Sequence, residues 1–263
     1  MNRKNLVDVS TPQPSPRRLP TIWMNFCRKH SSYSKAATVQ AKVAVWNAEL
    51  LPRIPKLEGK VLELGAGTGL FTKHLSKQFP QLVASDLSKE MVEEGRVALP
   101  EVSWRVFDAW SIPQDLQVTG LFSSSLLQWA THPMQVLSNW NAALDSGAWM
   151  LHSFFTDGSL RELKQVSPES LAVEFRPVDE WAQIFQEAGF EILDQAERED
   201  VLHFDSALGF FRNLHDLGTT SQNKFSSTQL RKVLKEYEAT FSSKPGVSAH
   251  WNTARILCQK SQG

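Results

Sequence analysis

The spacing of hydrophobic residues changes several times along the chain and divides it into predicted elements. Between residues 23 and 54 apolar side chains recur at helical spacing, and Pro52 and Pro55 end the predicted helix. From residue 60 onward, short apolar runs alternate with longer amphipathic stretches. The runs predict strands at 60–64, 82–85, 102–107, 120–124 and 148–154, and the stretches predict helices at 70–78, 88–97 and 133–144.

The alternation of strands with helices indicates the fold class. Because crossover helices connect parallel strands, we expect a doubly wound, mostly parallel α/β sheet. We expect a single domain over residues 21–263, with an N-terminal helix at about 21–55 and a disordered tail at 1–20. Beyond residue 154 the pattern changes, and we expect a helical lid at about 155–241 that one strand interrupts. The elements expected after residue 154 are helices at 158–165, 178–188, 205–217 and 227–241, and strands at 190–193 and 251–259.

The composition of the 263-residue chain narrows the classes of partner and location. The 28 Lys and Arg residues balance the 28 Asp and Glu residues, so the net charge gives no reason to expect a nucleic acid as partner. No run approaches the roughly 18 apolar residues that a membrane span needs. Cys27 and Cys258 lie far apart without metal-type spacing, so we expect reduced, buried thiols in a cytoplasmic protein. The seven histidines are scattered and predict no metal site.

A glycine-rich run follows the first predicted strand and carries the sharpest chemical signal. Gly65, Gly67 and Gly69 follow Glu63 and lead directly into the next predicted helix. Glycines permit a tight turn and let the backbone approach a ligand closely. An acidic residue two positions before the first glycine suits a ligand with a positive ammonium group and repels a pyrophosphate. The run therefore favours S-adenosylmethionine over a dinucleotide, and the alternative is a glycine-rich turn that binds no ligand.

Acidic residues also follow the second and third predicted strands. Asp86 is placed to bind the hydroxyls of a ribose, or alternatively to cap the helix that begins after Leu87. Asp108 is placed to accept a hydrogen bond from an adenine amino group, and the alternative is a solvated loop aspartate. The residues that we expect to contact the cofactor are Glu63, Gly65, Ala66, Gly67, Gly69, Asp86, Leu87, Met91, Asp108, Ala109 and Ser124.

The fourth predicted strand runs into the segment 123–129, which reads SSSLLQW. Ligands of doubly wound sheets lie outside the carboxyl ends of the strands, so we expect this segment beside the reactive methyl group. Gln128 and Trp129 are candidates to position the substrate, and the alternative for Trp129 is a place in the core. The segment lacks the Asn/Asp-Pro-Pro-Tyr/Phe motif of enzymes that methylate nitrogen, and no Ser-His-Asp or Cys-His arrangement has supporting spacing.

Five segments carry a more specific pattern. They read FCRKHSSY at 26–33, DLSKEM at 86–91, LQW at 127–129, GSLREL at 158–163, and ALGFFR at 207–212 followed by Leu217 and Gly218. Together with the predicted elements over residues 59–154, these segments resemble the malonyl-acyl-carrier-protein O-methyltransferases of biotin synthesis. That family belongs to the class I S-adenosylmethionine-dependent methyltransferases.

The resemblance implies a seven-stranded, Rossmann-like sheet and S-adenosyl-L-methionine as the cofactor. It implies methyl transfer to the free carboxylate of a malonyl thioester, giving the methyl ester that primes biotin synthesis. A malonyl carboxylate is ionised at neutral pH, so the reaction needs no general base. Tyr33 is the leading candidate to line the methyl-transfer chamber with Gln128 and Trp129, and the alternative for Tyr33 is packing on a helix surface.

The resemblance also implies an acyl carrier protein as partner. Carrier proteins are acidic, so we expect a basic docking face, and the candidates for it are Arg28, Lys29, Lys35, Lys42, Arg212, Arg231, Lys232 and Lys235. We expect one of Arg161, Arg176 and Arg212 to pair with the substrate carboxylate. The expected protein is a monomer without a nucleic-acid or membrane partner. Two alternatives stay open: methylation of another small acid or a quinone precursor, and a methyltransferase-like assembly factor that transfers no methyl group.

Overall fold

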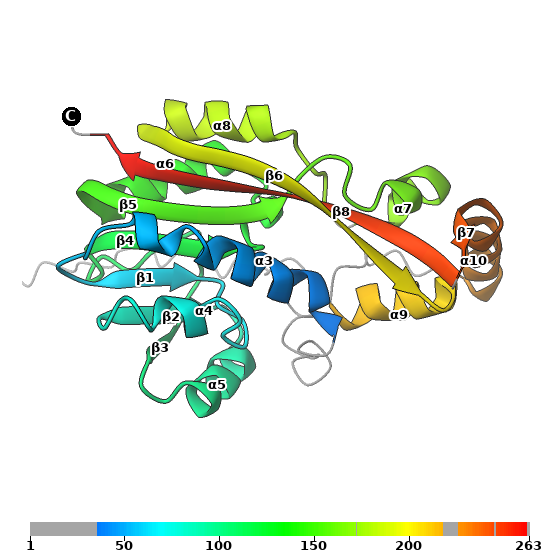
Figure 1. Cartoon of the computed structure of the whole chain (residues 1–263), viewed down its shortest axis with the longest axis horizontal. Coiled ribbons are helices and arrows are strands. Elements are labelled where there is room, and N and C mark those ends of the chain that lie inside the picture. The colour runs from blue at the N-terminus through cyan, green and yellow to red at the C-terminus, as the bar shows by residue number, and fades with distance from the viewer. Residues whose placement is uncertain (1–35, 172, 218–225, 245, 262–263) are drawn as a thin grey trace, which may run out of the picture.

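The computed structural model describes residues 36–171, 173–217, 226–244 and 246–261. Seven strands lie side by side in the order β3-β2-β1-β4-β5-β8-β6, and a short β7 pairs with β8 (Figure 1). The strands are β1 (Val61–Leu64), β2 (Leu82–Asp86), β3 (Ser103–Val106), β4 (Val118–Ser124), β5 (Leu144–Phe155), β6 (Phe190–Phe204), β7 (Ser242–Ser243) and β8 (Gly246–Lys260). The predicted doubly wound, seven-stranded α/β sheet is confirmed.

The described helices follow the strands as a doubly wound fold requires. They are α3 (Thr38–Ala48), α4 (Thr72–Leu75), α5 (Lys89–Ala98), α6 (Pro133–Ala143), α7 (Arg161–Val166), α8 (Val178–Glu187), α9 (Ala207–Asp216) and α10 (Ser227–Phe241), with short 3-10 helices η1 (Leu51–Arg53), η2 (Leu127–Trp129) and η3 (Pro168–Ser170). The helix predicted at 70–78 is helical only over α4, because the residues just before it complete the glycine turn and those after it form further turns.

The strand order reverses beside β1. This strand pairs in parallel with β2 on one side and with β4 on the other, and β2–β3 and β4–β5 are parallel as well. The connections that leave β1 and β4 therefore diverge at the carboxyl edge of the sheet. Such a reversal opens a crevice where doubly wound proteins bind their ligands.

Two apolar clusters cover the two faces of the sheet. Successive strand residues point to opposite faces, so Leu121 of β4 joins the cluster beneath α6 and α8, whereas Phe122 joins the cluster beneath α4 and α5. Both side chains are fully buried. Because both faces of the sheet are buried, the central strands are continuous apolar runs in the sequence and do not alternate apolar with polar residues.

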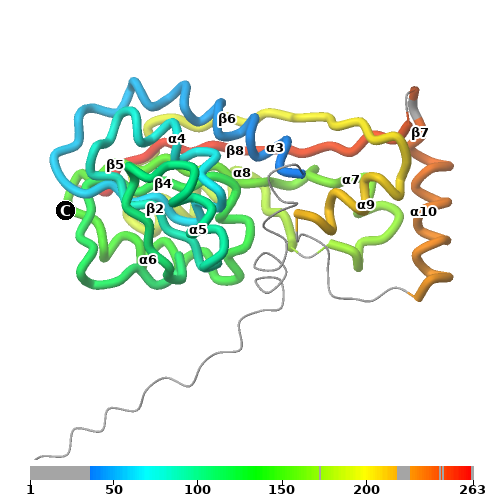
Figure 2. Tube along the Cα trace, turned by 90° about the horizontal axis from the view of Figure 1, so that it is seen from below, coloured from blue at the N-terminus to red at the C-terminus, as the bar shows by residue number. Residues whose placement is uncertain are grey.

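The last two strands of the sheet are much longer than the sequence predicted. Strands β6 and β8 each have fifteen residues and pair in antiparallel fashion from Phe190–Lys260 to Phe204–Val247. The prediction stopped at residue 193 because the outer part of β6 alternates exposed, often charged positions with less exposed ones and so does not form an apolar run. The paired strands β6 and β8 extend beyond the ends of the other strands, and α7, α9 and α10 lie beside this outer end (Figures 1 and 2).

The region expected to form a lid divides into two parts. Helix α8 packs beside α6, where Trp181 and Phe185 belong to the cluster on that face of the sheet. Helices α7, α9 and α10 stand at the other end and share a separate cluster that includes Phe210, Tyr237 and Trp251. The candidate lid within the described residues therefore consists of α7, α9 and α10.

Helix α3 is the described part of the predicted N-terminal helix. Its Val39 and Val43 pack in the cluster of the lid helices, and its Ala44 packs in the cluster on the sheet. Tyr33, Cys27 and the expected tail lie outside the described residues, and Cys258 is a buried thiol, as predicted. Among the described helices, none has the length and apolar character needed to cross a membrane.

Candidate functional site

The glycine run forms a tight turn between β1 and α4. Gly65, Gly67 and Gly69 have φ angles of 64°, 56° and 94°, in the left-handed region that side chains other than glycine rarely adopt. A Cβ atom at Gly65 would lie 2.8 Å from Cδ1 of Leu126. The N–H of Ala66 donates to the carbonyl of Ser85 at 2.8 Å and ties the turn to β2. The turn therefore requires glycine for both its conformation and its space.

Asp86, at the end of β2, holds the same turn. Its carboxylate accepts hydrogen bonds from the N–H groups of Gly67 and Ser88, both at 2.9 Å. Burial raises the pKa of Asp86, and these backbone donors oppose the shift. Ser88 caps helix α5 by accepting from the N–H of Met91 at 3.2 Å. The alternative that Asp86 caps this helix is wrong, because Ser88 occupies that position.

Glu63 is a buried carboxyl group directly below the turn. It is 1% exposed, and its Oε2 has no hydrogen-bond partner among the described residues. Burial raises the pKa of Glu63 to about 8, and the nearby charge of Asp86 adds to the shift. A buried carboxylate without a partner is costly, and a cation beside it removes that cost.

A small pocket opens where β1, the turn and β4 meet. Its lining residues are Gln40, Glu63, Gly65, Ala66, Gly67, Thr68, Leu70, Phe71 and Ser124. Five of the predicted cofactor residues thus line one pocket, namely Glu63, Gly65, Ala66, Gly67 and Ser124. Gln40 of α3 was not predicted, because a single polar residue on a helix carries no sequence signal that distinguishes it from its neighbours.

The other predicted cofactor residues are not in the lining of this pocket. Asp108 is half-buried, and its carboxylate accepts from the N–H of Trp110 at 3.0 Å. The carbonyl of Ala109 accepts from the indole of Trp140 at 2.7 Å. Gly69 completes the turn, Leu87 follows β2, and Met91 is buried in the first turn of α5.

The side chain of Gln128 forms hydrogen bonds that stabilise the loop after β4. Its Nε2 donates to the carbonyl of Ser125 at 2.7 Å, and its Oε1 accepts from the N–H of Phe155 at 3.4 Å. Ser125 has a φ of 56°, so this loop contains a strained residue at the carboxyl edge of the sheet. Trp129 is half-buried beside it, and neither apolar face cluster includes it. Gln128 thus holds the loop that borders the crevice, whereas Trp129 is not a core residue.

The comparison with known families agrees with this geometry. A family model described as a methyltransferase domain matches residues 9–195, which is well over half of the chain. The chain belongs to the methyltransferase domain family. Its cosubstrate is S-adenosylmethionine, and the residues that line the pocket suit the amino-acid end of that molecule. The left-handed glycine turn leaves the backbone open to a ligand, and the unpartnered Oε2 of Glu63 suits its ammonium group.

Two curated relatives of this methyltransferase have the same printed name. A protein of Acinetobacter baylyi is 26% identical over 202 residues, covering 76% of this chain and 78% of the relative. A protein of Anoxybacillus flavithermus is 26% identical over 246 residues, covering 86% of this chain and 92% of the relative. Both are named malonyl-[acyl-carrier protein] O-methyltransferase.

Solved structures share the fold of this methyltransferase at low sequence identity. The YcgJ protein of Bacillus subtilis has a TM-score of 0.62 at 14% identity and covers 83% of this chain and 100% of its own. A SAM-dependent methyltransferase of Thermotoga maritima has a TM-score of 0.56 at 17% identity and covers 91% of this chain and 100% of its own. At these identities the similarity establishes the fold alone.

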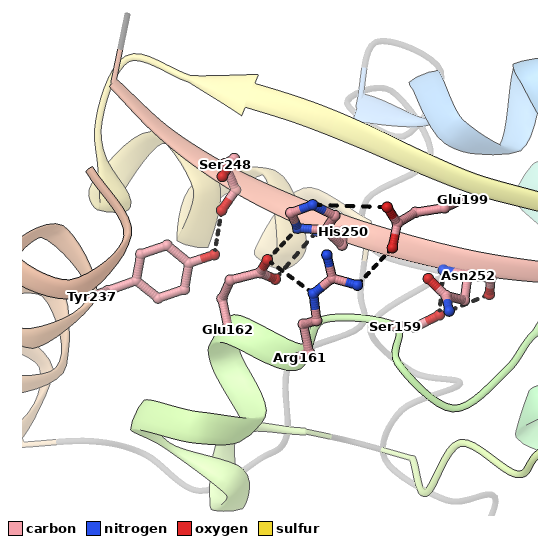
Figure 3. Close-up of polar contacts among 8 residues, drawn as sticks. All are labelled: Ser159, Arg161, Glu162, Glu199, Tyr237, Ser248, His250 and Asn252. Carbon is pink, nitrogen blue, oxygen red and sulfur yellow. Dashed lines mark hydrogen bonds and ion pairs between the residues drawn. The ribbon is translucent and has the colours of Figure 1, made fainter. Parts of the chain in front are cut away.

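Helices α7 and α10 of the candidate lid are joined to β8 by partly buried polar contacts (Figure 3). The carboxylate of Glu162 on α7 accepts from the backbone N–H of His250 at 3.2 Å and also contacts the imidazole of His250. The hydroxyl of Tyr237 on α10 donates to the carbonyl of Ser248 at 2.9 Å. Glu162 is only 3% exposed, and Arg161 also lies 3.8 Å from its carboxylate, so two basic side chains contact this buried group.

The three candidate arginines differ in their surroundings. Arg161 pairs with Glu199 at 2.6 Å (Figure 3), and Arg176, just before α8, pairs with Glu180 of that helix. Arg212 is exposed on α9 and has no ion-pair partner among the described residues. The geometry therefore leaves Arg212 as the candidate that is available to a substrate carboxylate.

Proposed function

We propose that this methyltransferase transfers the methyl group of S-adenosylmethionine to the free carboxylate of a malonyl group on acyl carrier protein. The product is the methyl ester that primes pimeloyl synthesis on the way to biotin. The observation that carries the proposal is the extent of the similarity to the Anoxybacillus relative, which reaches 86% of this chain and 92% of that protein. A match of this length extends past the family model into the region of the lid.

The proposed reaction requires the protein to bind and align the two substrates, and it requires no general base. A malonyl carboxylate is ionised at neutral pH, so it attacks without a general base. Bound S-adenosylmethionine supplies a methyl group on a positively charged sulfur. The turn at Gly67, with Asp86 and Glu63, holds the cofactor at the carboxyl edge of the sheet. Positioning the acceptor carboxylate against the methyl group of the bound cofactor would provide the rate enhancement.

The acceptor chamber is expected between this edge and the lid. Ser124 and the loop that Gln128 fastens border the crevice from β4, and Trp129 lies half-buried on the same loop. Tyr33 is proposed to close the chamber from the N-terminal side, and it lies outside the described residues. Excluding water from this chamber favours attack by the carboxylate, because the nucleophile loses its hydration.

We further propose that the carrier protein docks against α10 and that Arg212 pairs with the malonyl carboxylate. Arg231, Lys232 and Lys235 are all exposed on α10, which suits an acidic partner. Lys42, another of the candidates for docking, pairs instead with Asp200 at 3.6 Å. The remaining candidates Arg28, Lys29 and Lys35 lie outside the described residues.

Label transfer tests the proposal directly. The protein is incubated with methyl-labelled S-adenosylmethionine and malonyl carrier protein, and the carrier is examined for a base-labile methyl ester. Acetyl carrier protein, which has no free carboxylate, is the matched control and should remain unlabelled. Label on a free small acid or quinone precursor instead would replace the proposed acceptor. Cofactor binding by calorimetry without any turnover would favour an assembly factor.

A further inference from the structure

Gln40 lines the cofactor pocket and has a buried polar atom without a hydrogen-bond partner among the described residues. It lies on α3, is 8% exposed, and lines the pocket that the glycine turn forms. Its Oε1 atom is buried and has no hydrogen-bond partner among the described residues. An acceptor that is buried without a donor destabilises a folded protein, so a ligand that supplies the donor gains that energy on binding.

Glu63 of β1 lines the same pocket and has a second such atom. Its Oε2 is likewise buried and without a hydrogen-bond partner among the described residues. The pocket thus has two hydrogen-bond acceptors, one from α3 and one from the sheet, with Leu70 and Phe71 among its apolar lining residues. Two unpartnered acceptors on residues that line one small pocket suit a ligand group with several N–H donors and a positive charge.

We propose that Gln40 binds the α-ammonium group of S-adenosylmethionine together with Glu63. The ammonium group has three N–H donors and so satisfies both orphaned oxygens at once. This proposal rests on the cofactor and does not depend on which acid is methylated. It adds to the site a residue that comes from outside the glycine turn and the strand ends.

Helix α3 is anchored at both ends, so it holds Gln40 in place before the ligand arrives. Near its C-terminus, the amide of Asn47 donates to the hydroxyl of Ser153 on β5 at 2.7 Å. Just before its N-terminus, the carbonyl of Ala36 accepts from the amide of Asn213 on the lid helix α9 at 3.2 Å. A side chain on a fixed helix loses little freedom when it binds a ligand.

Binding of two ligands distinguishes a role of Gln40 in binding the ammonium group from a purely structural role. S-adenosylhomocysteine contains the amino-acid end, and 5′-methylthioadenosine lacks it. In Gln40→Met, we expect the affinity for S-adenosylhomocysteine to fall by about tenfold or more, as for a lost hydrogen bond to a charged group. The affinity for 5′-methylthioadenosine should stay unchanged. Equal losses for both ligands, or no loss for either, would overturn the proposal.

A measurement without ligand provides a second test. Because Gln40→Met removes an unpartnered polar group, the melting temperature of the ligand-free variant should equal or exceed that of the parent protein. A marked decrease in melting temperature would show that Gln40 stabilises the fold instead.

Gln40→Glu, which keeps an acceptor oxygen, should retain more of the affinity for S-adenosylhomocysteine than Gln40→Met, and the reverse order would contradict the proposal. Val45→Ala, an exposed position on the same helix, is the matched control and should change neither quantity. All of these readouts omit the acceptor, so they are independent of the label-transfer experiment.

Discussion

The backbone N–H of Gly67 donates to Oδ2 of Asp86 at 2.9 Å, so the glycine turn and the end of β2 are one unit. The residue that gives the turn its left-handed conformation also positions the carboxylate proposed to bind the ribose. A change at either residue therefore alters both, and this coupling makes the turn the most sensitive part of the site.

Gly67→Val tests the turn. The φ of 56° at Gly67 is strongly unfavourable for a β-branched residue, so the turn must open and release Asp86. We expect calorimetry to detect no binding of S-adenosylhomocysteine, while circular dichroism still reports a folded protein. Gly147→Ala is the control, because Gly147 also has a positive φ of 72° and does not line the pocket. It should cost stability and leave the affinity unchanged, and normal binding by Gly67→Val would refute the assignment.

Cofactor affinity should depend on pH through Glu63. Burial raises the pKa of Glu63 to about 8 in the ligand-free protein, so this carboxyl group is mostly protonated at neutral pH. Asp86 on β2 adds to the shift, and the Thr72 hydroxyl on α4 opposes it. An ammonium group beside Glu63 lowers its pKa, so binding releases a proton and the affinity rises with pH below 8.

Calorimetry in buffers of different ionisation enthalpy measures that proton. For S-adenosylhomocysteine we expect a release that approaches one proton at pH 6.5 to 7.5. Glu63→Gln cannot release a proton at this position and serves as the control. If that variant released as many protons as the parent protein, Glu63 would not be the titrating group.

His152 should make the fold sensitive to acid. It is completely buried between the rings of Trp140 and Phe185, and its Nδ1 contacts the Ser123 hydroxyl at 2.8 Å. Burial lowers the pKa of His152 from 6.5 to about 3, so the folded protein keeps it neutral while the unfolded chain takes up a proton. Its contribution is complete above the unfolded pKa and is lost as the pH falls, by about 2 kcal/mol at pH 5.

Urea unfolding at pH 7.5 and pH 5 measures this effect. Glu63 has the opposite dependence, since a carboxyl with a raised pKa stabilises the fold more as the pH falls. The comparison that isolates His152 is therefore the parent protein against His152→Gln. The variant should lose less stability between the two pH values than the parent does, and an equal loss would contradict the assignment.

Charge reversal on α10 tests the proposed docking face. We expect the triple variant Arg231→Glu, Lys232→Glu, Lys235→Glu to raise KM for malonyl carrier protein by about tenfold or more at low salt. The kcat value and the KM for a small malonyl thioester should change little, because the chamber is intact. The control reverses Lys56 and Lys60, which are exposed just before β1, at the edge opposite the pocket. If reversal of Lys56 and Lys60 raised KM for malonyl carrier protein as much, the rise would come from the net charge of the protein, and α10 would not be the docking face.

Tyr33→Phe tests the expected closure of the chamber. If the Tyr33 hydroxyl lines the chamber, the variant should bind S-adenosylhomocysteine normally and turn over slowly. Calorimetry and label transfer measure the two quantities separately. Normal turnover would assign Tyr33 to packing on the helix surface.

Local patterns in the sequence identified most of the sheet and the centre of the cofactor site. The strands β1, β2 and β4 are short apolar runs because both faces of the sheet are covered, and Gly65, Gly67 and Gly69 are conspicuous because few other residues tolerate their backbone angles. Each of these features is decided within a few residues.

Other features depend on partners that are distant in the sequence. The full length of β6 could not be predicted, because its polar outer half is held by pairing with β8 rather than by its own hydrophobicity. The hydrogen bond that Gln128 accepts from the backbone N–H of Phe155 also joins two residues that lie apart in the sequence, and a role of Gln128 in positioning the substrate stays a prediction. The choice among Arg161, Arg176 and Arg212 required the positions of their acidic neighbours.

By itself, the sequence determined the fold class, because strands and helices alternate along the chain. It also determined the cationic nature of the cofactor, because the glycines that follow a strand and the acid two residues before them form one short segment. Only the tertiary structure decided that Gln40 joins Glu63 in one pocket. Asn47, which anchors the helix of Gln40, contacts a residue 106 positions away in the chain. An unpartnered buried atom is defined by everything that surrounds it, and those surroundings exist only after the chain has folded.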